Sequence, residues 1–268
     1  TSSNKTYDAN TTATLDVSSV SYSGLESGDT FSGTYSGVFD NKNVGTGKTV
    51  TITPSYTGAD VSNYSVTDQA STTANITAKA LTVSGITAAN KTYDANTSAT
   101  LDASSVSYSG LVSGDTFAGT YSGVFDNKNV GTGKTVTITP SYSGADVGNY
   151  NVTNQASTTA NVTAKALTAT ASAANKTYNG NTTATTTLTF SGLIGTETLG
   201  QSVGSTFNNK NVGTGKTVTV NSITLADGSN GGLAANYSIS AGQTTTANIT
   251  AKALTVSGIT ASNKIYDG

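Results

Sequence analysis

Apolar and polar residues alternate along much of the chain. In the segment TVTIT, Val50 and Ile52 take one parity and the threonines beside them take the other. The same alternation recurs at Val136 and Ile138, at Val218 and Val220, and at Phe31, Tyr35 and Phe39. A period of two is typical of half-buried β-strands. The pattern predicts antiparallel strands, and no stretch has the sustained spacing of an amphipathic helix.

Clusters of Gly, Asn and Asp separate these apolar stretches and predict turns, as at SGD from Ser27 and DNKNVGTG from Asp40. The GTGKT segments at Gly45, Gly131 and Gly213 are reminiscent of a phosphate-binding loop. That motif needs a Gly where this chain has Lys42, Lys128 and Lys210, and it needs a helix to follow, whereas a strand follows here. A hairpin turn with glycine at positive φ explains GTGKT better.

The sequence repeats itself. NKTYD begins at Asn4 and Asn90, NKTYN at Asn175 and NKIYDG at Asn263. Two further markers keep the same order: NKNVGTGKTVT at Asn41, Asn127 and Asn209, and AN(I/V)TAKALT at Ala74, Ala160 and Ala247. So long a period suits a domain with its own core better than a short solenoid unit.

These markers divide the chain into residues 1–79, 80–165 and 166–252 as three repeat modules and 253–268 as the start of a fourth. The first two repeats are nearly verbatim copies, whereas the third carries an inserted GSNGG stretch at Gly228–Gly232. We expect the chain to be a slice of a longer array.

The junction between repeats has a distinctive pattern. In TANITAKALTV, Ala74, Ile76 and Ala78 share one parity, and Leu81 and Val83 take the other. A shift of one residue moves side chains to the opposite face of a strand. We therefore predict that the last strand of one repeat runs directly into the first strand of the next, without a flexible linker. Pro54 and Pro140 are expected at strand ends, away from the junctions.

The segment GADVSNYSV resembles the tyrosine corner of immunoglobulin-like domains, with Asp60, Tyr64 and Val66 in the key positions. Asp146, Tyr150 and Val152 repeat it, while the third repeat keeps Tyr237 and Ile239 but has Leu233 in place of the Asp. The alternative is an ordinary loop that ends in Tyr. The predicted fold is all-β: tandem immunoglobulin-like (Greek-key) β-sandwich modules that form an elongated rod.

Composition narrows the function. The chain has no Cys, Met, Trp or His, and all 13 basic residues are Lys, so common catalytic bases, thiolates and soft metal ligands are missing. Only 10% of residues are charged, with a net charge of -2, which disfavours nucleic acid and anionic membranes as partners. We expect no enzyme, and no catalytic, cofactor-binding or metal-binding residues.

Four motifs in order carry a family resemblance: K-x-Y-D(G) at Lys5, Lys91 and Lys264, then KNVGTGKTVT, GAD-x-x-NY and ITAKALT. Together they resemble the YDG-type tandem repeats of large bacterial surface adhesins, including filamentous-haemagglutinin-like proteins. The resemblance implies export to the cell surface, tandem β-sandwich stalks and roles in attachment, biofilm or filament architecture. The first two repeats read YDA and the third YNG, so the Gly and the Asp are each dispensable.

The sequence thus predicts a structural stalk or filament segment of an extracellular adhesin, which gives reach and stiffness. The alternative is a binding module in which each repeat grips a glycan or a neighbouring fibre through exposed Tyr and Asn. Expected partners are neighbouring copies of the chain, other repeats of the parent protein, surface glycans or biofilm matrix. The rings at Tyr7, Tyr22, Tyr35, Tyr56 and Tyr64 discriminate: buried rings favour the stalk and an exposed groove favours binding.

Other chemistry has weaker support. Carboxylates that recur once per repeat could gather at a junction and hold Ca²⁺, although capping of turns by Asp is the simpler role. They are Asp8, Asp16, Asp29, Asp40 and Asp60, with copies at Asp94, Asp102, Asp115, Asp126 and Asp146. Lys5 and Lys79 are candidates for isopeptide crosslinks. Asn4, Asn63 and Asn75 head glycosylation sequons, and Thr49, Thr51 and Thr53 resemble one row of an ice-binding sheet.

Overall fold

The computed structural model describes residues 1–268, which form an all-β protein. It divides into two compact units, the first being Thr1–Ala89, Ser98–Asp126 and Thr135–Ala160. The second is Asn90–Thr97, Asn127–Lys134 and Asn161–Gly268. Each unit contains one complete junction between repeats, and each is described by itself.

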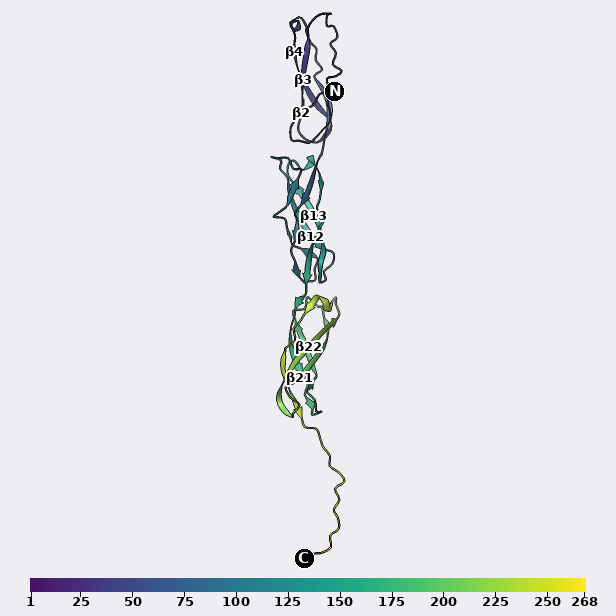
Figure 1. The fold of residues 1–268 in the computed structure, drawn as a ribbon, viewed down its shortest axis with the longest axis vertical. Coiled ribbons are helices and arrows are strands. Elements are labelled where there is room, and N and C mark those ends of the chain that lie inside the picture. Colours follow the sequence, from purple (N-terminus) through teal and green to yellow (C-terminus); the bar gives the residue numbers. More distant parts are fainter. The chain divides into compact units, whose positions relative to one another are not determined.

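The first repeat is built around one five-stranded sheet with the order β1-β5-β4-β3-β2. Its elements are β1 (Lys5–Thr6), β2 (Thr12–Ala13), β3 (Ser32–Phe39), β4 (Gly45–Thr57), the 3-10 turn η1 (Val61–Asn63) and β5 (Ser71–Thr77). β3 and β4, which are labelled in Figure 1, pair antiparallel from Ser32↔Thr57 to Phe39↔Val50. Phe39 and Val50 are fully buried, so the predicted alternation is confirmed.

The second repeat keeps this hairpin and adds a second, smaller sheet. Its elements are β6 (Lys79–Ser84), β7 (Thr87–Ala88), β8 (Lys91–Thr92), β9 (Ser98–Ala99), β10 (Leu101–Asp102), β11 (Ser107–Ser109), β12 (Ala118–Phe125), β13 (Gly131–Ser143), η2 (Val147–Asn149), β14 (Tyr150–Thr153) and β15 (Ser157–Thr163). β12 pairs with β13 and β9, and the small sheet has the order β11-β6-β14. Val83 of β6 and Ile138 of β13 belong to one buried cluster, so the two sheets share a core.

The third repeat repeats the five-stranded sheet in the order β18-β24-β22-β21-β19. Its elements are β16 (Lys165–Ala166), β17 (Thr168–Ala173), β18 (Lys176–Thr177), β19 (Thr183–Ala184), β20 (Thr186–Ser191), β21 (Leu199–Phe207), β22 (Gly213–Asp227), η3 (Ala234–Asn236), β23 (Tyr237–Ser238) and β24 (Thr244–Thr250). Residues 251–268 have no helix or strand and are exposed.

The strands that carry the alternation pair antiparallel, as predicted: β3 with β4, β12 with β13, and β21 with β22. Other pairs in the chain are parallel. β1 pairs parallel with β5, and β6 pairs parallel with β14. Alternation reports which face of a strand is buried but not the direction of its neighbour, because both ladder types have a side-chain period of two. The 3-10 turns also left no signal in the alternation. They are the only helices, and none is long and apolar enough to cross a membrane.

GTGKT is a bulge within a strand rather than the predicted hairpin turn. Gly47 has φ of 60°, as expected for glycine, but it lies inside β4, where the register against β5 shifts between Gly45 and Lys48. Pro54 also lies inside β4 and not at its end. β4 pairs only with β3 at this point, so the missing N–H of proline interrupts no ladder on the other side.

The predicted strand continuity at the junction is confirmed. Only Ala78 separates β5, which belongs to the sheet of the first repeat, from β6, which belongs to the small sheet of the second. Ile76 and Leu81 are both buried, so the buried parity changes between them. Ala78 itself is exposed and does not share the core face of Ile76. At the next junction only Ala164 separates β15 from β16.

Candidate functional site at the repeat junction

The first junction joins Tyr7 and Lys42 of the first repeat to three side chains of the second. The Tyr7 hydroxyl donates to Asp115 at 2.9 Å, and Tyr150 donates to the same carboxylate at 2.5 Å. Lys42 Nζ lies 2.8 Å from Asp146 and 3.2 Å from Asp115. The two tyrosine rings meet edge to face, with centroids 5.6 Å apart. Two tyrosines and one lysine therefore surround a pair of carboxylates.

Local structure holds each of these groups in place. Tyr7 directly follows β1, and its N–H donates to Thr77 at the end of β5. Lys42 lies in the turn between β3 and β4. Asp146 precedes η2, and its Oδ2 accepts the N–H of Thr116 at 2.9 Å. Tyr7 and Asp146 are therefore held in place by hydrogen bonds within their own repeats.

An asparagine contact closes the junction beside the charges. Asn149 of η2 accepts the N–H of Val44 at 3.0 Å and donates to Asn43 at 3.2 Å. It is only 4% exposed, so its amide would be costly to leave without partners. The buried cluster around Tyr7, Ile76, Leu81 and Tyr150 is continuous across the junction. The junction thus has the apolar core and satisfied polar groups of a domain interior.

The surroundings of Asp115 and Lys42 favour the charged form of each side chain. Burial raises the pKa of Asp115, but hydrogen bonds from Tyr150, Tyr7 and Lys42 outweigh it, so the pKa lies below its usual value. The bond to Asp146, with those to Tyr7 and Asp115, raises the pKa of Lys42. Burial, together with the Asp115 hydrogen bond, raises the pKa of Tyr150 to about 12. At neutral pH the lysine is charged, the acids are ionised and the tyrosines are protonated.

The second junction uses the same plan with one acid fewer. Glu197 accepts the hydroxyls of Tyr93 at 2.7 Å and Tyr237 at 2.6 Å, and Lys128 Nζ lies 3.3 Å from it. Asn236 accepts the N–H of Val130 at 2.9 Å and is completely buried. The rings of Tyr93 and Tyr237 again meet edge to face.

Leu233 stands where the second repeat has Asp146, so the third repeat lacks the second carboxylate. Glu197 alone contacts both tyrosines and the lysine, as Asp115 does at the first junction. Burial raises the pKa of Glu197, but hydrogen bonds from Tyr237, Tyr93 and Lys128 outweigh it and leave the pKa lowered. The arrangement therefore survives a change in its acids.

The K-x-Y-D(G) motif builds the end of the repeat that carries Tyr7. Lys5 Nζ lies 2.6 Å from Asp8 and donates to Asn10 Oδ1 at 2.9 Å. Ala9 between them has φ of 64°, a left-handed conformation that favours glycine. The corresponding Ala95 and Gly180 have φ of 63° and 83°. The Gly of the signature thus corresponds to a backbone requirement that alanine meets with strain.

The predicted candidate sites lie mostly in turns. Backbone N–H groups donate to Asp8, Asp16, Asp40, Asp94 and Asp102, as turn capping requires. Asp115 and Asp146 do gather at the junction, as the calcium hypothesis needs, but Lys42 Nζ lies against both. No group of three or more acidic side chains is arranged to hold a metal ion. Among the other candidates, Lys5 contacts Asp8 and Asn10, Lys79 begins β6, and Thr49, Thr51 and Thr53 are exposed.

The tyrosine-corner interpretation is wrong. In a tyrosine corner the hydroxyl bonds back to the backbone a few residues upstream. Here the Tyr64 hydroxyl accepts the N–H of Glu26 and donates to Asp29, both far upstream, and Tyr150 does the same with Val112 and Asp115. Asp60 instead accepts the N–H of Thr30. The loop does hold a tyrosine with a structural role, but the hydroxyl of this tyrosine bonds to residues at the end of the repeat and not to its own loop.

Sequence reasoning missed the junction group itself. Every member was visible as part of a repeated motif, namely Tyr7 in NKTYD, Lys42 in NKNV and Tyr150 in GADVGNY. What the sequence did not reveal is that motifs of one repeat meet those of the next. The recurrence of these tyrosines and this lysine in each copy was the available signal.

Comparisons with known proteins agree with the repeat pattern. The sequence signature of the YDG domain matches residues 1–74, 77–160 and 163–247. No curated protein matches the chain. Among solved structures, the I9–I11 tandem of titin is similar at 12% identity, covering 94% of this chain and 97% of that one. Its TM-score is 0.23, which does not establish a shared fold.

Proposed function

The chain belongs to the YDG domain family, with three copies in tandem, and we propose that it is a structural segment of an extracellular bacterial surface adhesin. In this proposal the repeats are immunoglobulin-like sandwiches in an elongated rod, which gives reach and stiffness for attachment or biofilm. Partners are other repeats of the parent protein, neighbouring copies, surface glycans or matrix. The proposed role is structural and includes no catalytic activity.

The junction is the observation that supports the proposal most. One exposed residue, Ala78, separates the strands of neighbouring repeats, so few backbone torsions are free to act as a hinge. The hydrogen bond between Tyr7 and Asp115 restrains the angle between the first two repeats. The contact of Asn149 restrains the same angle at a second point. A joint restrained by a continuous strand and two sets of buried polar contacts resists bending, which is what a stalk requires.

The positions of the tyrosines support the stalk in part, but one observation favours the binding alternative. Tyr7 is buried, whereas Tyr22, Tyr35, Tyr56 and Tyr64 are half-buried and lie around Phe31. They line an open groove in the first repeat, which favours the binding alternative. In the second repeat β6 covers the corresponding tyrosines, so a binding groove is not present in every repeat.

The stiffness can be measured between the first two repeats. The chain has no Cys, so Ser36→Cys and Ser122→Cys, both exposed and in corresponding strands, give two unique spin-label sites. We expect a narrow distribution of distances between the labels by pulsed electron resonance. Insertion of Gly-Ser-Gly after Ala78 should broaden it, whereas the same insertion after the exposed Gly180 should leave it unchanged. A broad distribution in the parent chain would contradict a stiff stalk.

A further inference from the structure

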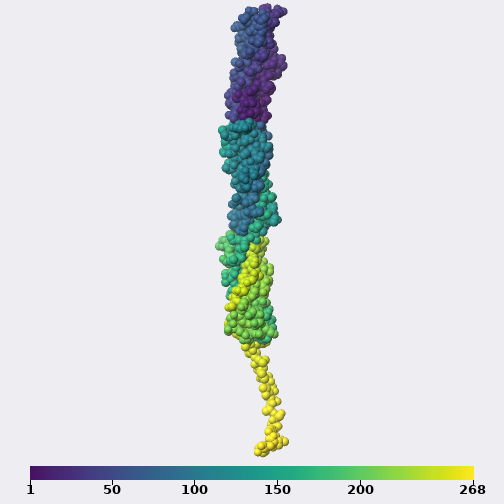
Figure 2. Space-filling model, turned by 60° about the vertical axis from the view of Figure 1, so that its left-hand side comes forward, coloured from purple at the N-terminus to yellow at the C-terminus, as the bar shows by residue number.

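In every repeat the short strand of the NKTY motif pairs parallel with the last strand of the same repeat. β1 pairs with β5 in the first repeat, β8 with β15 in the second and β18 with β24 in the third. In the third repeat, Figure 2 shows the yellow C-terminal strands beside the green residues with which that repeat begins. Segments from near the two ends of each repeat are thus joined directly.

Side-chain bonds strengthen this short pair. In the second repeat, Asn90 Oδ1 accepts the N–H of Asn161 at 2.7 Å, and Thr163 Oγ1 donates to the carbonyl oxygen of Lys91 at 3.3 Å. The N–H of Tyr93 donates to the carbonyl oxygen of Thr163 at 2.8 Å. We call the pair of β8 and β15, together with these three bonds, the strand clasp.

The same side-chain bonds recur in the other two repeats. The corresponding asparagine bonds measure 2.8 and 2.6 Å and the threonine bonds 3.3 and 3.4 Å: Asn4 with Asn75, Asn175 with Asn248, Thr77 with Lys5, and Thr250 with Lys176. The third repeat keeps them although its loops and its junction acids have changed. The Asn of NKTY and the Asn of AN(I/V)T therefore have a shared role inside each repeat, apart from the junction.

A second parallel pair holds the strand with which the second repeat begins. Residues Lys79–Thr82 of β6 pair parallel with β14, and β6 also pairs antiparallel with β11. Leu81 of β6 is fully buried. The chain enters the second repeat through Ala78 and β6 and leaves it through β15 and Ala164. Both strands that connect the second repeat to its neighbours are therefore held in parallel pairs.

Parallel pairing decides how tension acts on these strands. In a parallel pair, the N-terminal end of one strand and the C-terminal end of its partner lie at opposite ends of the pair. The C-terminal end of β14 leads to β15, and the N-terminal end of β8 leads back to β6. A pull on the two neighbouring repeats therefore draws β6 along β14 and β15 along β8. Sliding of this kind loads all hydrogen bonds of a pair together, whereas opening from one end would load them one by one.

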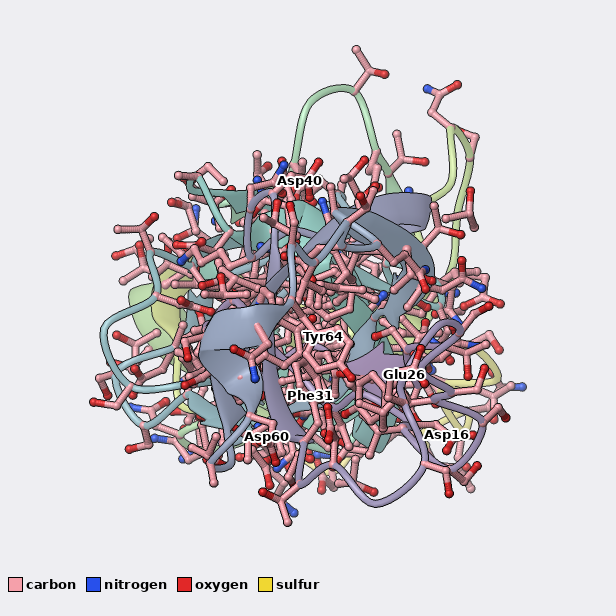
Figure 3. All side chains as sticks on the ribbon, turned by 90° about the horizontal axis from the view of Figure 1, so that it is seen from above. Asp16, Glu26, Phe31, Asp40, Asp60 and Tyr64 are labelled. Carbon is pink, nitrogen blue, oxygen red and sulfur yellow. The ribbon has the colours of Figure 1, made fainter.

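The hairpin strands are loaded only indirectly. β12 and β13 are joined by a turn, as β3 and β4 are joined by the turn that begins at Asp40, which is labelled in Figure 3. None of these four strands continues directly into a neighbouring repeat. Tyr121 of β12 and Tyr142 of β13 make hydrogen bonds of their own, to Tyr108 at 3.0 Å and to Asn154 at 2.7 Å. These bonds give a control inside the same repeat.

We propose that the pair of β6 and β14 and the strand clasp are the load-bearing elements of the repeat, so that the repeat stays folded under tension along the chain. Unfolding under tension then requires β6 to slide past β14 or β15 to slide past β8. Resistance to tension goes beyond the reach and stiffness of the proposed function, because a segment that resists bending can still unfold at low force.

Constant-force magnetic tweezers on the full chain, held by tags at its two termini, test the load-bearing role. Asn90→Ala with Thr163→Val removes the two side-chain bonds of the strand clasp. We expect the lifetime of the folded second repeat at a fixed force to shorten about 30-fold, as for the loss of two net hydrogen bonds. Tyr121→Phe with Tyr142→Phe also removes two hydrogen bonds, but from the hairpin strands. Its lifetime should stay close to that of the parent, because these bonds are still intact when the clasp breaks.

Urea unfolding without force is the reference for both double variants. Each loses two hydrogen bonds, so both should lower the urea midpoint by similar amounts. Equal lifetimes of the two double variants at the same force would overturn the proposal. If N90A/T163V does not fold, T163V alone replaces it, with an expected shortening of about fivefold. A lifetime of T163V equal to that of the parent would then overturn the proposal.

A disulfide identifies the unfolding step of the second repeat. Thr92 and Thr163 are register partners in the pair of β8 and β15, and both are exposed. Since the chain has no Cys, Thr92→Cys with Thr163→Cys gives a unique pair within the span of a disulfide. After oxidation the bond bypasses residues 93–162, so one unfolding step should shorten by their length and recover its length in reductant. Failure of the folded chain to form this disulfide would contradict the register on which the clasp depends.

The load-bearing role and the proposed stiffness can fail separately. A narrow distribution of distances between the Ser36 and Ser122 labels, together with equal lifetimes of the two double variants, would leave a stiff stalk without a load-bearing clasp. A broad distribution together with the shortened lifetime of N90A/T163V would describe repeats that resist tension but are joined flexibly.

Discussion

The hydroxyl of Tyr7 donates a hydrogen bond to Asp115, which lies in the next repeat, 108 residues along the chain. The Asp115 side chain is only 2% exposed, so the bond is shielded from water. Tyr93 and Glu197 repeat this relationship, 104 residues apart. The bond recurs at the second junction with a different acid. The tyrosine hydroxyl is therefore the part of this bond that both junctions share.

Substitution of Tyr7 by Phe should weaken the first junction. The ring is kept, but a buried carboxylate loses one donor, at a cost of about 1.5–3 kcal/mol in the free energy of unfolding. Urea unfolding measures the loss. Tyr178→Phe is the matched control, because that hydroxyl bonds to no protein group in the structure, and it should change stability little. Equal effects of the two substitutions would show that the Tyr7 bond contributes nothing.

Removal of the junction lysine should matter more at the first junction than at the second. Lys42→Met leaves Asp115 and Asp146 beside each other without a cation, whereas Lys128→Met leaves Glu197 alone. We expect the larger fall in the urea midpoint for K42M. Addition of Asp146→Leu to K42M, which copies Leu233, should recover part of the loss. No recovery would mean that repulsion between the two acids is not the cause.

The junctions should be most stable over a broad neutral range of pH. The folded pKa of Asp115 is lowered, so its contribution is present above its unfolded pKa of about 3.9 and is lost as pH falls through the folded value. The pKa of Tyr150 is raised to about 12, so its contribution is complete below the unfolded pKa of about 10 and is lost as pH rises through the folded one. The chain has no His or Cys, the side chains whose ordinary pKa values lie closest to neutral pH.

Thermal unfolding across pH measures this plateau. We expect a midpoint that is nearly constant from about pH 5 to 9 and falls on both sides. Asp115→Asn should flatten the acid limb, because that position then no longer binds a proton. A steep slope within the neutral range would contradict the assignment.

The signature glycine should act through backbone strain. Ala95 has φ of 63°, where alanine is disfavoured by about 1–2 kcal/mol relative to its ordinary conformations. Ala95→Gly should therefore stabilise the chain by up to about 1 kcal/mol, and Gly180→Ala should destabilise it by about 1 kcal/mol. Urea unfolding of the two variants gives the comparison, and effects of the same sign would refute the strain argument.

The hairpins and the strand junction could be predicted because each depends on local pattern. Val136 and Ile138 repeat with a period of two, and Ile76 and Leu81 differ in parity, so the burial of these side chains followed directly from the sequence. The parallel pair of β1 and β5 could not be predicted, since strand direction leaves no trace in the alternation.

The junction site was beyond sequence reasoning for a different reason. Tyr64 and Tyr150 have nearly the same sequence context, yet Tyr150 is buried and Tyr64 is half-buried. The difference comes from whether another repeat covers the tyrosine, and no local pattern records that. Asp115 and Asp146 were each interpreted as turn residues, and their contacts with Tyr7 and Lys42 arise only where the ends of two repeats meet.

The single residue between β5 and β6 also bears on how such arrays change in length. Because KALTVSGITA is identical at residues 79–88 and 252–261, recombination between the two stretches would delete or duplicate whole repeats and restore the same ten residues. The new neighbours would meet through the same strand and the same tyrosine, lysine and acid. Gene rearrangement would thus change the number of repeats, and each new junction would have the same contacts as the existing ones.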